Sequence, residues 1–324
     1  MKAVHNVRVT AAVAVAFFFT VTTAYCETFP SRPIHFVLGN APGSVLDVAA
    51  RQLAKQLAVQ VGRPVIVENR PSAGGIVALD YVKKSPADGY TLDMVAMPQM
   101  SVSPALFAQL PFDPLKDFSH VGILFRGPQL LVVNASLPAT TFAEFVTLAS
   151  KKPHGLTYSS PGSGSPGHIL MEDVSHQAGA NLRHIPYKGP AANTAVVSGE
   201  VDALLEGVSQ MQPLIDAGKL RALAVTGDRR IESMPDVPTF KELGIKDIDA
   251  VWVGVVAPRG TPAAIIDYLN REMAKAALSS EIRAAYEQVG RIVTPGSPQE
   301  MTATIESEIP RWRTVIKRGG IVAD

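Results

Sequence analysis

Short apolar runs alternate with helical stretches along almost the whole of this chain. Helical stretches carry apolar residues three and four positions apart, whereas strands are runs of four to eight apolar residues. The predicted strands are residues 34–38, 65–67, 91–95, 119–124, 129–133, 156–159, 183–185, 203–205, 222–225 and 251–256, and the clearest predicted helices are residues 48–61, 140–150, 262–277 and 297–318. This alternation predicts parallel-rich sheets covered by helices on both faces. The length of 324 residues predicts about two domains, so we expect two α/β domains.

The first 26 residues have the layout of a secretory signal peptide. Lys2 and Arg8 precede an apolar run at residues 11–21, which is shorter than the ~20 residues needed to span a bilayer. Cleavage is expected after Ala24 or after Cys26. An uncleaved anchor and a lipid-modified Cys26 are the alternatives, the second disfavoured by the bulky Tyr25. The predicted location is the periplasm.

Composition excludes several classes of function. The chain has 30 Lys and Arg against 29 Asp and Glu, without the basic patch that a nucleic-acid-binding protein shows. Removal of residues 1–26 leaves 28 basic and 29 acidic residues and removes the single cysteine. Disulfides, thiolate nucleophiles and cysteine-ligated zinc are therefore excluded for the mature chain. The histidines lack metal-ligand spacing, and no cofactor is expected.

Two loops between a predicted strand and the following helix are the candidate binding sites. The first loop is residues 40–47 and the second loop is residues 159–168. Such loops bring backbone N–H groups of a helix N-terminus to the carboxyl end of a sheet, where they can hold an anion. Both loops could also be simple tight turns. The candidate ligand-binding residues are Asn40, Ala41, Gly43, Ser44, Val45, Leu46, Asp47, Ser160, Gly162, Ser163, Gly164, Ser165, His168 and Lys188.

Enzymatic interpretations of these loops are weak. Gly162, Gly164 and Gly167 match the G-x-G-x-x-G pattern, but the acid that a dinucleotide site needs after the next strand is missing. The chain has no G-x-S-x-G nucleophile elbow, and Ser165 with His168 is as well explained by capping of a helix. No catalytic residues are therefore predicted.

Four other side chains have more than one interpretation. Asp47 is expected to hydrogen-bond nearby backbone N–H groups rather than to act as a general base. Lys188 either meets an anion or is an ordinary surface lysine. Arg126 faces the cleft or the surface, and Trp252 belongs to the core or lines the ligand site.

Seven fragments in this order resemble the TctC/Bug family, the extracytoplasmic solute receptors of tripartite tricarboxylate transporters. They are FPSRPI (29–34), VENRP (67–71), ADGYTL (87–92), GSGSPGH (162–168), HIPYKG (184–189), DVPTF (236–240) and APRGTP (257–262). The resemblance implies a type II periplasmic-binding fold: two α/β lobes joined by crossover strands, with the ligand cleft between them. Lobe 1 would comprise residues 27–125 and 251–324, and lobe 2 residues 126–250.

The resemblance also implies a function. Members mostly bind small carboxylates through backbone N–H groups, hydroxyls and water from the two loops, and closure of the lobes buries the ligand. It further implies transfer to membrane transporter subunits, no enzymatic activity and no nucleic-acid partner. A monomer is the default for such receptors. An exported α/β hydrolase or lyase, an orphan periplasmic sensor and the effector domain of a transcription regulator are the alternatives.

The first loop departs from the family pattern of a Gly-Gly pair, a hydroxyl residue and a helix-starting Asp. Here Gly43-Ser44 is followed by Val45, Leu46 and Asp47, and Ser72 replaces the usual Gly before Ala73. Val45 removes a hydroxyl, and Leu46 adds apolar bulk. These differences predict a ligand with one carboxylate and an apolar or aromatic body rather than a citrate-like polyanion.

Overall fold

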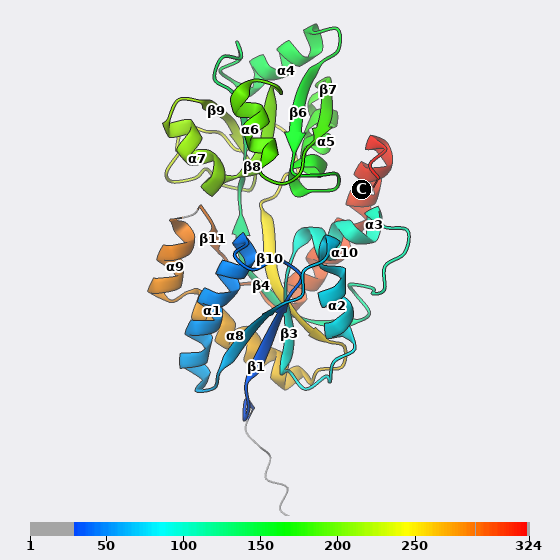
Figure 1. Ribbon diagram of the computed structural model, residues 1–324, viewed down its shortest axis with the longest axis vertical. Helices are drawn as coiled ribbons and strands as arrows, with labels where there is room; N and C mark the ends of the chain where they lie inside the picture. Colours follow the sequence, from blue (N-terminus) through cyan, green and yellow to red (C-terminus); the bar gives the residue numbers. More distant parts are fainter. Residues whose placement is uncertain (1–28, 289, 323–324) are drawn as a thin grey trace, which may run out of the picture.

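The computed structural model describes residues 29–288 and 290–322. In this part of the chain the strands form a six-stranded and a five-stranded sheet, each covered by helices (Figure 1). We call the larger sheet with its helices lobe 1 and the smaller sheet with its helices lobe 2. The predicted α/β fold with two lobes is confirmed.

The sheet of lobe 1 has the strand order β11-β4-β10-β3-β1-β2. Its strands are β1 (Ile34–Leu38), β2 (Val65–Asn69), β3 (Thr91–Ala96), β4 (Phe118–Gly127), β10 (Val251–Pro258) and β11 (Ile292–Val293). Its helices are α1 (Val45–Val61), η1 (Ala73–Gly75), α2 (Ile76–Lys83), η2 (Pro98–Val102), α3 (Ser103–Leu106), α8 (Ala263–Ala277), α9 (Ser280–Glu287) and α10 (Pro298–Gly319).

The sheet of lobe 2 has the strand order β7-β6-β8-β5-β9. Its strands are β5 (Gln129–Asn134), β6 (Leu156–Ser160), β7 (Leu182–Pro186), β8 (Ala203–Gly207) and β9 (Leu220–Val225). Its helices are α4 (Phe142–Lys151), α5 (Pro166–Ala178), α6 (Ala191–Ser198) and α7 (Val208–Asp216).

The expectation of parallel-rich sheets is wrong, because both sheets are mixed. Strand β10 runs antiparallel to β3 and β4, and β5 runs antiparallel to β8 and β9. The cause is the crossover between the lobes. Strand β4 leads directly into β5, and β10 returns from lobe 2, so each connecting strand enters its sheet against the direction of its neighbours.

The topology brings the strand ends of the two lobes together. Strands β1 and β3 are parallel, and β3 and β4 both oppose β10, so all three end at the edge where β4 passes into β5. Strand β8 opposes β5, and β6 is parallel to β8, so β6 and β8 end beside the start of β5. The carboxyl ends of both sheets therefore face the junction of the lobes.

One hydrophobic core cluster continues from lobe 1 into lobe 2. It includes Leu79 of α2, Trp312 of α10 and Leu170 of α5, all with 1% exposure or less. Helix α10 rises beside α5 on one side of the molecule (Figure 1). The lobes are thus packed together on the α10 side.

Among residues 29–288 and 290–322, no helix is long and apolar enough to cross a membrane. The predicted signal peptide, with its alternatives at Cys26, lies outside the described residues.

Candidate ligand-binding site

The carboxylate of Asp47, a residue that is 3% exposed, holds the first loop in place. The Asp47 carboxylate accepts hydrogen bonds from the backbone N–H of Gly43 at 2.9 Å, from Arg51 Nε at 3.0 Å and from Asn69 Nδ2 at 2.8 Å. The bond from Arg51 is the largest of the effects that lower the pKa of Asp47 to about 2. Asp47 therefore holds the loop in place with a permanent negative charge.

The structure separates the other first-loop candidates into exposed and buried groups. Ala41, Gly43 and Val45 are exposed, Val45 to 57%. Ser44 caps α1 by accepting a hydrogen bond from the N–H of Asp47. Leu46 packs into the core of lobe 1 and is 9% exposed, so the apolar bulk expected from it does not face solvent. Any apolar character that this loop offers a ligand comes from Val45.

The second loop is held by a network of side chains. The hydroxyl of Ser160 donates to Gly162 O at 2.9 Å and also contacts His184 Nε2 at 2.7 Å. The N–H of Gly164 donates to His168 Nδ1 at 3.2 Å. Ser163 is half-buried, and Ser165 starts α5 without a capping bond from its side chain. The backbone between Gly162 and Ser165 is thereby fixed at the N-terminus of α5.

This network argues against a serine nucleophile. Ser160 lies within hydrogen-bonding distance of a histidine, but it is 0% exposed and its hydroxyl proton is directed at Gly162 O. The Nδ1 atom of His168 is used by the loop backbone. Among residues 29–288 and 290–322, no group of three His, Cys, Asp or Glu side chains is placed to hold a metal ion.

Buried polar atoms in both loops lack a hydrogen-bond partner within the described part of the chain. They include Asn40 Oδ1 of the first loop, Ser165 Oγ of the second loop and Asn193 Oδ1 of α6. Leaving a buried polar atom unpaired costs about 1–3 kcal/mol, so such atoms mark places where a ligand or water is bound. Asn193 is a residue that the sequence analysis missed.

Lys188 lies next to the second loop. The N–H groups of Tyr187 and Gly189 on either side of it donate to Ser160 O and Pro161 O. The side chain of Lys188 is exposed. Its position fits both predicted interpretations, a cation beside the anion-binding loop and a solvated lysine.

Close contacts of three glycines lie near the two loops. A Cβ atom on Gly39 would overlap Gly75, and a Cβ atom on Gly75 would overlap the side chain of Gln99 at the start of η2. Helix α3 follows η2, and its Leu106 packs so closely on Gly164 of the second loop that a Cβ atom there would overlap it. Glycine is favoured at both positions mainly by the positive φ angles of Gly75 (70°) and Gly164 (76°), which other residues rarely adopt.

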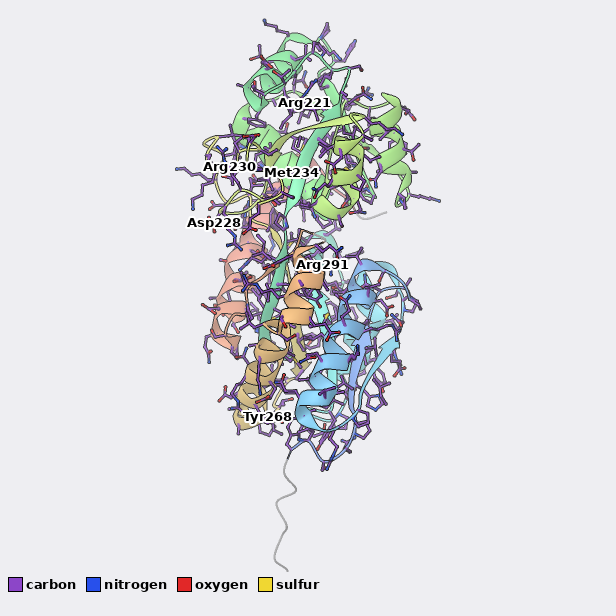
Figure 2. All side chains as sticks on the ribbon, turned by 90° about the vertical axis from the view of Figure 1, so that its left-hand side faces the viewer. Arg221, Asp228, Arg230, Met234, Tyr268 and Arg291 are labelled. Carbon is purple, nitrogen blue, oxygen red and sulfur yellow. The ribbon has the colours of Figure 1, made fainter. Side chains whose placement is uncertain are left out.

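Two further charged residues lie at the junction of the lobes. Arg291 Nη2 donates to the backbone O of Val45 in the first loop at 3.0 Å, and Arg291 lines a cavity together with Arg229 and Arg230 of lobe 2 (Figure 2). Glu206 ends β8 at the same edge as the second loop, and burial raises its pKa. No local sequence pattern points to Arg291, because it lies 246 positions after Val45 along the chain.

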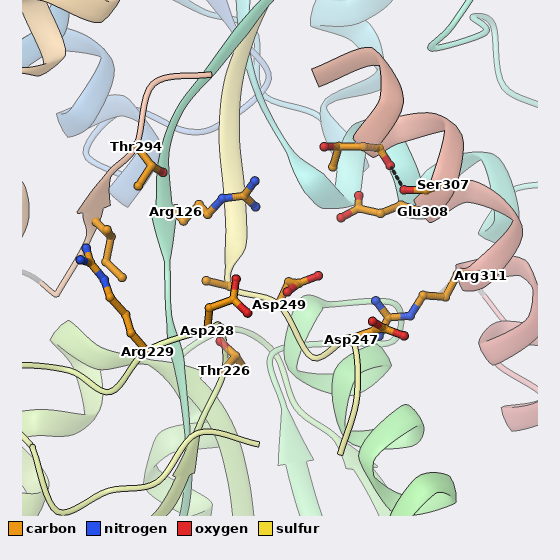
Figure 3. A pocket seen from close by; sticks show the side chains of 14 residues that line it. Arg126, Thr226, Asp228, Arg229, Asp247, Asp249, Thr294, Ser307, Glu308 and Arg311 are labelled. Carbon is orange, nitrogen blue, oxygen red and sulfur yellow. Dashed lines mark hydrogen bonds between the residues drawn. The ribbon is translucent and has the colours of Figure 1, made fainter. Parts of the chain in front are cut away.

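A cavity of about 580 Å³ lies at the crossover between the lobes (Figure 3). Arg126 of β4 lines it, together with the segments 226–229 and 247–250 and with Glu308 and Arg311 of α10. Trp252 is fully buried beside it and donates its Nε1–H to Glu308 Oε2 at 3.0 Å. We call this the hinge cavity. Arg126 thus faces a space between the lobes, whereas Trp252 belongs to the core.

Comparison with known proteins identifies the relatives of this chain. Residues 49–321 match the TctC family model, described as the tripartite tricarboxylate transporter family receptor. Protein BugT of Bordetella pertussis is 33% identical over 297 residues, which cover 91% of each chain. The structure of R. palustris Rpa4515 with adipate has a TM-score of 0.77 and 33% identity, covering 91% of this chain and 100% of that one. MatC from Rhodopseudomonas palustris with bound malate has a TM-score of 0.73 and 29% identity, covering 89% and 100%.

The two-lobed fold and the loops at its junction define a solute-binding protein. Within that class, the chain belongs to the TctC family of tripartite tricarboxylate transporter receptors.

Proposed function

We propose that the mature protein is a periplasmic receptor that captures a small carboxylate between its lobes and delivers it to tripartite tricarboxylate-type membrane subunits. The observation that carries this proposal is that the first and second loops both follow strands whose carboxyl ends face the junction of the lobes. Each loop opens a helix, α1 or α5, so free N–H groups and the helix dipole favour an anion there. Export through the predicted signal peptide at residues 1–26 is part of the proposal.

The proposed contacts are the thirteen predicted residues of the two loops and Lys188, with four changes of role. Asp47, Ser160 and His168 act by holding the loops, and Leu46 contributes its backbone only, because all four side chains are buried. Asn193 and Arg291 are added as neighbours of the site. Closure of the lobes completes the site by bringing the two loops onto the same ligand.

We propose a ligand with one carboxylate and an apolar body. Val45, 57% exposed where a hydroxyl residue is usual in the family, supports this class. Within the described residues, Arg51 beside the first loop is neutralised by its ion pair with Asp47, which leaves the exposed Lys188 and the half-buried Arg291 as the cations beside the loops. A polyanion would need more positive charge than these two groups supply.

We further propose that the lobes follow the predicted division into residues 27–125 plus 251–324 and residues 126–250, and that the protein is a monomer. The division is supported by the sheets, because every strand of lobe 2 lies between Gln129 and Val225.

Thermal unfolding of the refolded mature protein with a panel of acids tests the proposed function. The panel is benzoate, nicotinate, adipate, malate and citrate. A ligand at 100 times its Kd adds about 2.7 kcal/mol to the free energy of unfolding, which raises Tm by several degrees. We expect benzoate or nicotinate to give the largest shift, with the acid recovered unchanged.

Each other result of the panel has a defined meaning. A larger shift with citrate would contradict the proposed ligand class, and no shift with any acid would contradict the receptor. Consumption of an acid that Ser165→Ala abolishes would favour the exported hydrolase, since a receptor with this change only binds more weakly.

A further inference from the structure

Two histidines lie directly beneath the second loop. His168 is in the first turn of α5 and is 5% exposed, and His184 is on β7. Their rings are stacked, with centroids 3.5 Å apart and an angle of 16° between the planes. The ring of Tyr158 on β6 lies 5.0 Å from that of His184. The loop that would bind the carboxylate therefore rests on an imidazole pair.

The hydrogen bonds define the protonation state of His168 in this conformation. Gly164 N–H donates to His168 Nδ1, so Nδ1 carries no proton and the ring is neutral with its proton on Nε2. The Nε2 atom lies 4.0 Å from Glu172 Oε1. If His168 took up a second proton, its Nδ1–H and the N–H of Gly164 would be two donors facing each other. The hydrogen bond between them would then be lost.

The hydrogen bonds of Ser160 define His184 in the same way. The single hydroxyl proton of Ser160 is donated to Gly162 O, so the hydroxyl oxygen accepts from His184 Nε2–H at 2.7 Å. It also accepts from the N–H of Gly162 at 3.3 Å. His184 thus fixes the start of the loop, and His168 fixes its middle.

We propose that His168 and His184 are positioning residues of the carboxylate site, and that protonation of His168 weakens carboxylate binding by releasing Gly164. The inference rests on the proposed function, because it concerns the loop that binds the ligand. Neutral His168 holds the second loop in this geometry by accepting the hydrogen bond from the N–H of Gly164. Cationic His168 cannot accept the bond from Gly164, so the loop loses that geometry.

The charged and titratable groups around the pair act in opposite directions. Glu172 on α5 favours the cationic ring, and Tyr158 on β6 donates its hydroxyl to the same Glu172 oxygen at 2.6 Å. When His184 is protonated, its positive charge disfavours a second positive charge on the stacked ring of His168. Arg311 and Arg318 of α10 oppose a further cation, but both are paired with Asp173. At the ends of β7 and β8, Lys188 and Glu206 carry opposite charges when both are ionised.

Binding of benzoate and adipate to four proteins at pH 7.5 and 5.5, measured by calorimetry, tests this proposal. His168→Asn places an amide oxygen where Nδ1 lies, so it accepts from Gly164 at every pH. His168→Leu keeps the volume but removes the acceptor. His176→Asn is the control, because His176 is an exposed histidine on the same helix.

We expect wild-type protein and His176→Asn to bind about tenfold more weakly at pH 5.5, because the lower pH favours the cationic form of His168. His168→Asn should bind within about threefold of wild type at pH 7.5 and lose most of the pH dependence. His168→Leu should bind at least tenfold more weakly at both pH values. The protonation of the ligand itself is the same for every protein and cancels in the comparison.

Equal pH dependence of His168→Asn and wild type would overturn the inference and leave the receptor intact. Absence of binding by wild type at either pH would instead overturn the proposed function and the inference with it. The amide NMR signal of Gly164 in ligand-free wild type provides a second readout. The chemical shift of this signal should change in one transition, over the same pH range in which the affinity for the carboxylate falls. A chemical shift that stays constant from pH 8 to 5.5 would also overturn the inference.

Discussion

Asp93 shows how a single buried group sets the response of the whole protein to pH. It is 0% exposed on β3, and neither carboxylate oxygen has a hydrogen-bond partner within the described residues. Burial raises the pKa of Asp93 well above its usual value, so the folded protein keeps this carboxyl protonated. The unfolded chain ionises it above pH about 4, and therefore binds fewer protons than the folded protein. The free energy of unfolding consequently falls as pH rises from about 4 toward the folded pKa.

Replacement of Asp93 by a neutral residue should remove this dependence. We expect the free energy of unfolding of Asp93→Asn, relative to that of wild type, to be higher at pH 7 than at pH 4. The reason is that only wild type must take up a proton on Asp93 when it folds at pH 7. Urea unfolding between pH 4 and 8 measures the effect, with the exposed Asp216→Asn as control. Parallel pH profiles for wild type and Asp93→Asn would contradict the assignment.

At the scale of elements, the sequence predicts whatever is determined by neighbours along the chain. Thr141 and Glu144 at the start of α4 form a reciprocal cap, which can form because the two residues are only three positions apart. All ten predicted strands lie within observed strands for the same reason. Strand β11 was missed because it has two residues and exists only through pairing with β4.

The candidate site divides in the same way. The two loops could be located because each combines turn residues with a helix start. Other features of the site depend on partners in other elements, which no local pattern reveals. These features are the burial of Leu46, the hydrogen bond from Asn69 to Asp47 and the hydrogen bond from Arg291 to Val45.

The packing of α10 on α5 includes a partly buried ion network. Asp173 of α5 is 8% exposed and pairs with Arg311 at 2.8 Å and Arg318 at 3.0 Å. We expect Asp173→Ala to lower the free energy of unfolding by about 2–3 kcal/mol, because it leaves two cations without their acceptor. Lys241→Ala, which breaks an exposed pair with Asp228, should change stability little. Equal urea midpoints for the two variants would show that the Asp173 network does not stabilise the contact.

For the whole molecule, the junction combines an apolar contact with polar loop ends. The hydrophobic core continues from lobe 1 to lobe 2 beside α10, and the hinge cavity lies next to it. The first and second loops lie at the same junction, and each contains a buried polar atom, Asn40 Oδ1 or Ser165 Oγ, without a partner within the described residues. A ligand between these loops therefore gains most if the lobes pivot about the α10 side and close over it.

The two tryptophans of the chain are placed differently with respect to such a movement. Trp252 crosses the junction on β10 and is hydrogen-bonded to Glu308 at the hinge cavity, and Trp312 of α10 lies in the core shared by the lobes. We expect a ligand that raises Tm to change the tryptophan emission and to lower the radius of gyration measured by X-ray scattering. Trp252→Phe should lose most of the emission change, because the segments beside Trp252 at the hinge cavity come from both lobes. Trp312→Phe should keep the change, because Trp312 moves together with its own helix. An unchanged radius of gyration at saturating ligand would mean that the ligand binds without closure, and the pivot about α10 would then have to be abandoned.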